Sequence, residues 1–453
     1  MSQIAPRLLV IGTVWPEPKS SAAGTHLLSL INVFQRNGYE CHFACPANHY
    51  EAQHTIDLSA LNITAVNIEL NDSRFDEMVG ELAPDVVLFD RFMMEEQFSW
   101  RVRAACPNAL CILDTEDIHS LRELRRRLHN QYPNIDLSIE ALAQYHEGDS
   151  AYPQLQGCLH NELAIREITS IMRMDLSLII SKQEYQFITK HYPLSADTLF
   201  YCPFLTPGIT NKQQAQWLSF EQRQHFVFIG NYRHAPNWDA VQYLAKTVWP
   251  QIKAQLPEAQ CYVYGACTPA KAQQFNQPKS GFHIAGWARD AQTVLENARI
   301  NLAPLRFGAG LKGKVFDAAQ VGTPSMMTTI ASEGIYTDEV LCIADDAQEF
   351  ANKAVQLYQD RELWTSTQQS NAAHLNAQFN ANHYSDFLLT NVASANDGDS
   401  QTLSVSVKKD WDNGFNANLA YAYTQSEDAN PMTSSVAYSN YINVAVADVN
   451  API

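Results

Sequence analysis

The sequence predicts an α/β protein of two doubly wound domains, followed by a short β-rich tail. Three observations support this prediction. Short apolar runs alternate with helical stretches along 7–205 and again along 225–360, which is the pattern of strands joined by crossover helices. A polar stretch at 206–224 that contains Pro207-Gly208 separates the two halves. The chain has 453 residues, more than one ordinary hydrophobic core accommodates.

The first half contains the apolar runs and amphipathic stretches of a complete α/β domain. Strands are predicted at Arg7–Gly12, Cys41–Ala44, Pro84–Asp90, Leu110–Leu113 and Asp175–Ser181, and Thr198–Phe204 closes the domain. Helices are predicted at His26–Asn37, Glu95–Ala105, Asn161–Met172 and Lys182–His191. Residues 130–157 lack clear periodicity and contain two Tyr-Pro pairs, so they are predicted to form an irregular insertion.

The second half repeats the alternation of strands and helices. Strands are predicted at His225–Gly230, Cys261–Gly265, His283–Ala285, Ile300–Ala303, Pro324–Thr329 and Leu341–Ala344, and helices at Val315–Val321, Ala347–Tyr358 and Arg361–Leu389. The predicted organisation is a first domain at 1–205, a linker at 206–224, a second domain at 225–360, helices at 361–393 that cross back to the first domain, and a tail at 394–453.

Composition excludes several classes of protein. The net charge of −17 argues against a nucleic-acid partner. The nine cysteines are scattered without a Cys-x-x-Cys pair, which fits free thiols in a reducing compartment. No apolar run approaches the roughly 18 residues of a membrane helix. The first apolar run, Leu8–Val14, is followed by Trp15-Pro16 and is interpreted as a strand rather than a signal peptide, so we expect a cytoplasmic protein.

One glycine-rich loop carries the clearest indication of function. It follows the strand at Ile300–Ala303 and contains Gly308 and Gly310, then leads into a helix. Backbone N–H groups of such a loop can bind an anion at a helix N-terminus, where the helix dipole favours negative charge. Lys312 and Lys314 add positive charge, and Asp317, one turn into the helix, can accept hydrogen bonds from a diol such as ribose. These features indicate a nucleotide diphosphate; the alternative is an ordinary basic turn.

A longer pattern around this loop resembles the group 1 glycosyltransferases, which have the GT-B fold. The matching residues are Pro304, Arg306, Gly308, Gly310, Lys314, Asp317-Ala318-Ala319, Gly322, Pro324 and Glu333-Gly334. The resemblance covers roughly 225–345 and extends more weakly over 7–390. It implies two Rossmann-like domains that face a cleft, a nucleotide-diphosphate sugar as donor, retention of the anomeric configuration, and no required metal or other cofactor.

The resemblance also implies roles for individual residues. It assigns charge stabilisation on the leaving diphosphate to Arg233, Lys312 and Lys314. It assigns donor binding to Gly24, Gly308, Ala309, Gly310, Asp317 and Glu333, with Asp317 on the ribose and Glu333 on the nucleotide or sugar. Many relatives have a sugar-contacting glutamate where this chain has Ala309, so that contact is expected from the loop backbone. Trp287 is expected near the nucleotide base or, alternatively, in the core.

An acidic cluster in the first half is a second candidate site. Asp114, Glu116, Asp117 and His119 follow the strand at 110–113, at the carboxyl end where open α/β sheets bind ligands. We interpret the acids as acceptor contacts and His119, or one of the acids, as a proton-transfer group. The alternative is a helix-capping cluster that pairs with the arginine run at 122–127. That run itself is interpreted as a solvated helix face, with peripheral contact to a membrane or an anionic acceptor left open.

The tail differs in character from the rest of the chain. Apolar and small or polar residues alternate at 403–408 and 415–423 around Asp412-Asn413-Gly414, a pattern that predicts a β-hairpin. The segment resembles a fragment of a TonB-dependent outer-membrane receptor barrel and would by itself suggest the outer membrane. It has too few strands to close a barrel. A chimeric reading frame and a docked hairpin both remain open.

The sequence therefore predicts a glycosyltransferase of the kind used in polysaccharide biosynthesis, acting on a nucleotide-sugar donor. The acceptor could be a glycan, a lipid or a small molecule, and the oligomeric state stays open. The alternatives are a non-catalytic nucleotide-sugar-binding protein, suggested by Ala309, and a chimeric product that includes an outer-membrane receptor fragment.

Overall fold

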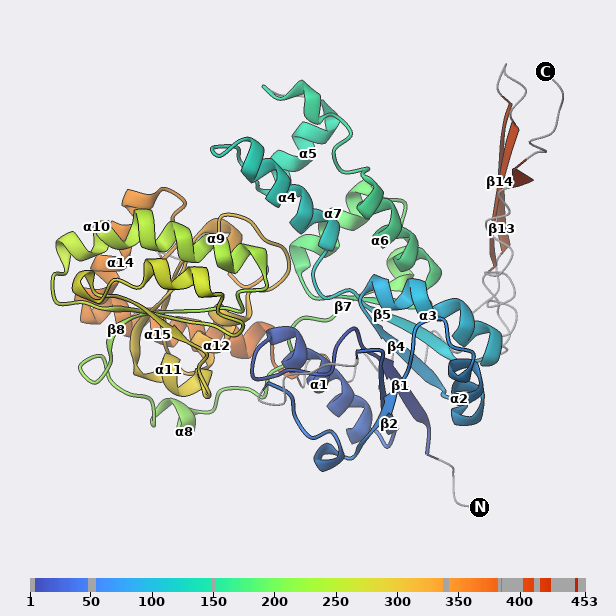
Figure 1. Cartoon of the computed structure of the whole chain (residues 1–453), viewed down its shortest axis with the longest axis horizontal. Coiled ribbons are helices and arrows are strands. Elements are labelled where there is room, and N and C mark those ends of the chain that lie inside the picture. The colour runs from blue at the N-terminus through green and yellow to red at the C-terminus, as the bar shows by residue number, and fades with distance from the viewer. Residues whose placement is uncertain are drawn as a thin grey trace.

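The structure is a computed structural model of the whole chain. It describes residues 5–47, 54–148, 151–336, 342–381 and 384, together with the backbone of three strands in the tail. Two α/β lobes lie side by side, the first in blue to green and the second in yellow-green to orange (Figure 1). The predicted two-domain α/β architecture is confirmed.

The first domain contains a seven-stranded sheet in the order β3-β2-β1-β4-β5-β6-β7, and every neighbouring pair is parallel. Successive residues of a strand pack on opposite faces: Leu9 and Val87 belong to one hydrophobic cluster, Val10 and Val86 to the other. Both faces are therefore covered, as a parallel sheet requires. The strands are β1 Arg7–Ile11, β2 Glu40–Cys45, β3 Ile63–Asn67, β4 Val86–Asp90, β5 Leu110–Asp114, β6 Leu176–Ile179 and β7 Leu199–Tyr201.

Helices of the first domain begin at side-chain caps that the sequence contains. Ser21, Asn161 and Ser181 each accept a hydrogen bond from a backbone N–H of the helix that follows. The helices are α1 Ala22–Arg36, α2 Arg74–Leu82, α3 Phe92–Ala105, α4 His119–Gln131, α5 Ile139–Glu147, α6 Glu162–Arg173 and α7 Lys182–His191, with short 3₁₀ turns η1 Ser59–Leu61, η2 Pro153–Leu155 and η3 Ala196–Thr198.

The predicted irregular insertion at 130–157 is wrong in its middle, because α5 forms there. Ser138 caps α5 by accepting from the Ala141 N–H, and Gly148 ends it in a left-handed conformation. Leu142 and Tyr145 are buried, so α5 has an apolar face that the short sequence window did not reveal.

The second domain contains a five-stranded parallel sheet in the order β10-β9-β8-β11-β12. Its strands are β8 Gln224–Ile229, β9 Cys261–Tyr264, β10 Phe282–Gly286, β11 Ala298–Ala303 and β12 Ser325–Met327. In place of the strand predicted at 341–344, the described residues show a single bridge between Ile343 and Met327. The helices are α9 Ala235–Tyr243, η4 Leu244–Val248 (a π-helix turn), α10 Trp249–Gln255, η5 Ala270–Phe275, η6 Pro278–Ser280, α11 Ala291–Asn297, α12 Gly313–Gln320, α13 Thr329–Ser332, α14 Ala347–Gln359 and α15 Arg361–Gln378.

The two domains share one hydrophobic core at their junction. A single cluster includes Ile180 and Ile188 of the first domain and Leu311 of the second. The rings of Phe204 and Phe316 lie 5.6 Å apart across the junction. Burial of aromatic and aliphatic area on both sides stabilises the two lobes against each other.

The segments that join the domains also pack closely. Residues 206–224 contain a short helix, α8 Asn211–Gln214. Within this segment the Thr206 N–H donates to the Phe379 carbonyl at 3.0 Å, just beyond α15. The ring of Tyr384 then lies 5.9 Å from that of Tyr201 in the first domain. The chain after α15 thus returns to the first domain.

The tail contains an antiparallel three-stranded sheet. Strands β13 Thr402–Asp410 and β14 Asn416–Thr424 pair with each other, and β14 also pairs with β15 Ala445–Val446. The predicted hairpin is confirmed at the level of the backbone, while its predicted turn, Asp412-Asn413-Gly414, lies outside the described residues. Across the described part of the chain, no helix has both the length and the apolar character needed to cross a membrane.

Candidate active site

The glycine-rich loop lies between the end of β11 at Ala303 and the start of α12 at Gly313, and its tip touches the first domain. Gly310 has a φ of +62°, the left-handed region that favours glycine. A Cβ atom at Gly310 would lie 2.6 Å from the Cβ of Asp117, closer than such atoms approach. Backbone conformation and space both require glycine here, and the loop therefore meets the predicted acceptor-side cluster.

Two helix N-termini converge beside this loop. A Cβ atom at Gly313, the first residue of α12, would lie 2.3 Å from the Cβ of Ala22, the first residue of α1. Gly24 is packed against the backbone of Glu17, where a Cβ atom would lie 2.7 Å from the carbonyl carbon. The positive ends of both helix dipoles face the same region, which favours an anion there.

Lys312, Lys314 and Asp317 line the start of α12. The Nζ of Lys312 donates to the Gly310 carbonyl at 2.5 Å, and that of Lys314 donates to Asn237 Oδ1 at 2.8 Å. Burial, helped by the charge of Lys312, lowers the pKa of Lys314 to about 7. Burial raises the pKa of Asp317 to about 7, although the charge of Lys314 opposes that rise. Both groups therefore titrate near neutrality.

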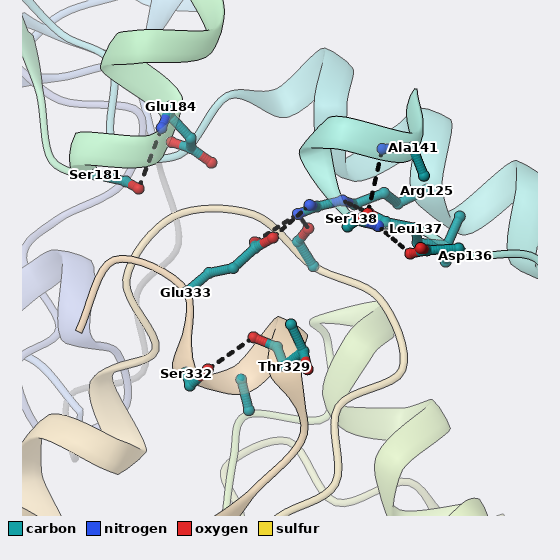
Figure 2. A network of polar contacts seen from close by, with 12 residues as sticks. Arg125, Asp136, Leu137, Ser138, Ala141, Ser181, Glu184, Thr329, Ser332 and Glu333 are labelled. Carbon is teal, nitrogen blue, oxygen red and sulfur yellow. Dashed lines mark hydrogen bonds and ion pairs between the residues drawn. The ribbon is translucent and has the colours of Figure 1, made fainter. Parts of the chain in front are cut away.

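Glu333 is held by an arginine of the other domain. Figure 2 shows Arg125 of α4 and Glu333 of the second domain pointing toward each other. Two parallel hydrogen bonds of 2.7 and 2.6 Å join the guanidinium to the carboxylate. Arg125 also donates to the carbonyls of Gly308 and Leu137, each at 2.8 Å, and its side chain is fully buried. We call this set of contacts the Arg125 clasp.

Glu184 of α7 also reaches the loop from the first domain. Its Oε1 accepts a hydrogen bond from the Gly310 N–H at 2.5 Å, and its Oε2 accepts from the Ile118 N–H at 3.3 Å. Only 2 % of Glu184 is exposed. Burial raises its pKa to about 8, and the nearby charge of Asp117 adds to the rise.

Asp117 and His119 lie close together at the start of α4. Asp117 pairs with Arg122, and its Oδ1 lies 3.4 Å from the Nε2 of His119. Burial would raise the pKa of Asp117, but the charge of Arg122 and its hydrogen bond to the carboxylate oppose this and help to hold the pKa below its ordinary value. Burial lowers the pKa of His119 to about 4, so this imidazole is neutral at physiological pH.

Asp114 and Glu116 differ from Asp117, because they face inward. They are 0 % and 5 % exposed and lie near His26 and Asp90. Burial raises the pKa of Asp114 to about 7 and that of Glu116 to about 8, and Asp90 and Asp114 respectively add to these rises. Within the described residues, both ring nitrogens of His26 and one oxygen of each of the three acids have no hydrogen-bond partner. Of the predicted acceptor contacts, only Asp117 adjoins the glycine loop.

Two further predicted site residues follow strands of the second domain. Arg233 lies on an exposed turn after β8, and its backbone N–H donates to Asn231 Oδ1 at 2.9 Å. The pKa of its neighbour His234 is lowered by the protein that surrounds the ring and by the charge of Arg122, while the charge of Asp117 opposes this change. Trp287 is not in the core: its Nε1 donates to the Lys19 carbonyl at 3.3 Å and so bridges the two domains.

Arg125, Glu184 and His234 were not among the residues predicted from the sequence. Arg125 is one of the arginines at 122–127, a run interpreted as a solvated face, which is wrong for this residue. The signal that could have found it is the stripe Leu121, Leu124 and Leu128, since Arg125 is buried beside these leucines. Glu184 follows Ser181 by three residues, a spacing that indicates helix capping rather than a contact with another domain.

Comparison with known proteins identifies the domain that holds the loop. Residues 223–360 match the family model described as Glycosyl transferases group 1. This domain is that of a glycosyltransferase. A search of curated protein sequences gives no significant match for the chain.

Solved structures share the fold of this glycosyltransferase over most of its length. A sucrose-phosphate synthase from Thermosynechococcus elongatus aligns with a TM-score of 0.59 at 13% identity, over 85% of this chain and 98% of the other. A glycosyltransferase from Rickettsia africae aligns at 0.58 and 10% identity, over 86% and 98%. Anabaena HepE, solved in complex with UDP and glucose, aligns at 0.56 and 11% identity, over 85% and 99%.

The family match confirms the predicted enzyme class. The solved structures confirm the predicted GT-B fold, and at 10–13% sequence identity they show the fold alone. These comparisons do not support the predicted resemblance of the tail to an outer-membrane receptor, because the family match ends at residue 360.

Proposed function

We propose that this glycosyltransferase transfers a sugar from a nucleotide-diphosphate donor to an acceptor hydroxyl, with retention of configuration. The observation that carries the proposal is the glycine loop, which presents backbone amides, Lys312, Lys314 and Asp317 together at the N-terminus of α12 and against the first domain. Amides and lysines suit a diphosphate, and a carboxylate one turn further along suits the ribose diol.

The roles proposed for the site residues follow from their positions. Lys312, Lys314 and the Gly310 amide would stabilise the charge that grows on the leaving diphosphate, with Arg233 approaching from its exposed turn. An acceptor, whether glycan, lipid or small molecule, would approach beside Asp117, which adjoins the loop, and His119, whose Nε2 lies 3.4 Å from the Asp117 Oδ1. The neutral imidazole of His119 can accept a proton from that acceptor.

A thermal-shift series with nucleoside diphosphates and their sugar conjugates tests the proposal. A ligand that binds only the folded state raises the melting temperature by an amount that grows with the ratio of its concentration to its dissociation constant. We expect one base to be preferred and the shift to be lost in Lys314→Ala. The matched control is Lys279→Ala, which removes an exposed lysine of the same domain and should keep the shift. No shift with any nucleotide in the unmodified protein would contradict the proposal.

Asp317→Ala should weaken nucleotide binding by about 1.5–3 kcal/mol, the range for hydrogen bonds to a charged group. The physical reason is the loss of the carboxylate proposed to accept both ribose hydroxyls. Calorimetric titration with the nucleotide and with its 2′,3′-dideoxy analogue measures this directly. The variant should bind the analogue as tightly as the unmodified protein does. An equal loss of affinity for both ligands would show that Asp317 does not recognise the ribose hydroxyls.

Nucleotide affinity should also fall as pH rises above neutrality. Burial lowers the pKa of Lys314 to about 7 in the free protein, so the lysine loses its charge above that pH, while the anion favours the charged form. Binding must then take up a proton, with a slope of at most about tenfold per pH unit. Calorimetry in two buffers of different ionisation enthalpy measures the uptake. Lys314→Gln should reduce the number of protons taken up on binding. An unchanged number would show that another group takes up the proton.

A further inference from the structure

The contact between Glu184 and Gly310 joins a carboxylate of the first domain to the amide that the proposed function assigns to the donor. Its donor–acceptor distance is 2.5 Å, the two residues are separated by 126 positions in the chain, and the pair is buried. The second carboxylate oxygen is held by the Ile118 N–H, so both oxygens have backbone partners. Figure 2 shows Glu184 at the start of α7, close to Ser181. The same turn of α7 meets the second domain at Gly334, where a Cβ atom would lie 3.0 Å from the Ser181 Oγ.

A backbone amide has a single proton to donate. In the structure the Gly310 N–H gives that proton to Glu184, in the way that a loop amide would give it to a phosphate oxygen. A carboxylate and a phosphate both present negatively charged oxygens to such donors. A diphosphate that uses the Gly310 amide must therefore first displace Glu184.

The surroundings of Glu184 make a second anion unfavourable while the carboxylate stays in place. The charged groups that face it are Asp117 from the first domain and Lys312 and Glu333 from the second, with Arg125 bound to Glu333. Two of these neighbours are acids, and Lys312 already donates to the Gly310 carbonyl. When Glu184 is ionised, its charge repels a diphosphate placed at the Gly310 amide, and removal of the Glu184 charge would relieve that repulsion.

We propose, resting on the donor site assigned above, that Glu184 is a built-in competitor of the donor: its carboxylate occupies the Gly310 amide in the unliganded protein and lowers the affinity for the diphosphate. Binding of the donor and release of Glu184 are then one coupled event. Since Glu184 belongs to the first domain and Gly310 to the second, the same event breaks one contact between the domains and exchanges it for a contact to the donor.

The test compares the binding of two probes, the preferred nucleoside diphosphate and inorganic pyrophosphate, to the unmodified chain and to Glu184→Gln. Both proteins are measured at each pH of a series that spans the ionisation of Glu184, so that the titration of Lys314 affects both alike. Glutamine keeps the shape and a carbonyl acceptor but removes the charge. We expect both probes to bind about fivefold or more tightly to Glu184→Gln, and tighter still to Glu184→Ala, which also frees the amide. The matched control is Glu162→Gln, an exposed first-turn glutamate of α6, which should change neither affinity.

The outcomes separate this proposal from the proposed function. Unchanged or weaker binding of both probes in Glu184→Gln, with the nucleotide still bound by the unmodified chain, overturns the competition and leaves the donor site standing. Tighter pyrophosphate binding without any nucleotide binding supports the competition and contradicts the nucleotide donor. Failure of both probes to bind any variant overturns both. If Glu184→Gln or Glu184→Ala does not fold, as shown by loss of the native melting transition, Glu184→Asp takes its place. Its shorter side chain should release the Gly310 amide, and both probes should then bind more tightly.

Discussion

Replacing Lys314 with alanine should lower the rate of glycosyl transfer by about a hundredfold or more while the protein stays folded. Loss of one preorganised group that stabilises developing charge has an effect of this size. Lys314 lies in the first turn of α12, with its Nζ 2.8 Å from Asn237 Oδ1 and 5.5 Å from the centre of the Phe228 ring. These neighbours hold the ammonium in place before the donor arrives, so the substitution removes a positioned charge.

Stability should not account for this loss of activity. Burial disfavours the charged form of Lys314, as its lowered pKa indicates, so alanine removes a group that is costly to bury. We expect an unchanged or higher melting temperature together with a lower turnover number. Lys279→Ala provides the surface control. Turnover at the level of the unmodified enzyme in Lys314→Ala would show that this lysine takes no part in the reaction.

Replacing Arg125 with methionine should destabilise the protein by about 3 kcal/mol, the lower end of the range for breaking a buried ion pair. Arg125 is fully buried, whereas 14% of the Glu333 side chain is exposed, which is why the lower end is expected. The substitution leaves Glu333 without its partner and also removes donors from the carbonyls of Gly308 and Leu137. Denaturant unfolding followed by two probes, one in each domain, measures the loss.

A double-mutant cycle isolates the ion pair from the other contacts of Arg125. Glu333→Gln keeps a hydrogen-bonding side chain and should cost less than Arg125→Met. The pair Arg125→Met with Glu333→Leu should recover part of the loss, because neither charge then remains buried alone. A change below about 0.5 kcal/mol in Arg125→Met, the size of an ordinary surface substitution, would mean that the Arg125 clasp is open in solution.

The local patterns of the sequence were sufficient for most strands of the two sheets, although the edge strand β3 Ile63–Asn67 was not among the predicted strands. Buried strands such as Val86–Asp90 are apolar on both faces, because helices cover the sheet on both sides, and such runs are recognisable without a structure. Gly308, Gly310 and Lys314 predict an anion site because the chemistry of a phosphate loop is local in sequence, and this site stays a prediction. The prediction of a β-hairpin in the tail rested on the same kind of local alternation.

Contacts between distant residues could not be predicted in this way. Arg125 and Glu333 are 208 positions apart, and each has an ordinary local explanation, as a charged residue on a helix and as part of a loop motif. Glu184 has the spacing of a capping residue, yet its carboxylate reaches another domain. Asp114 and Glu116 stand at a strand end as expected, but both are buried and lie beside His26 of α1, and no pattern of spacing shows that burial.

The most direct test of the donor site is a crystal structure with the nucleoside diphosphate that gives the largest thermal shift. We expect the diphosphate to lie on the Gly310 amide and beside Lys314, the ribose hydroxyls to bind Asp317, and the carboxylate of Glu184 to have moved away from the loop. A nucleotide bound elsewhere, with Gly310 still hydrogen-bonded to Glu184, would contradict this expectation.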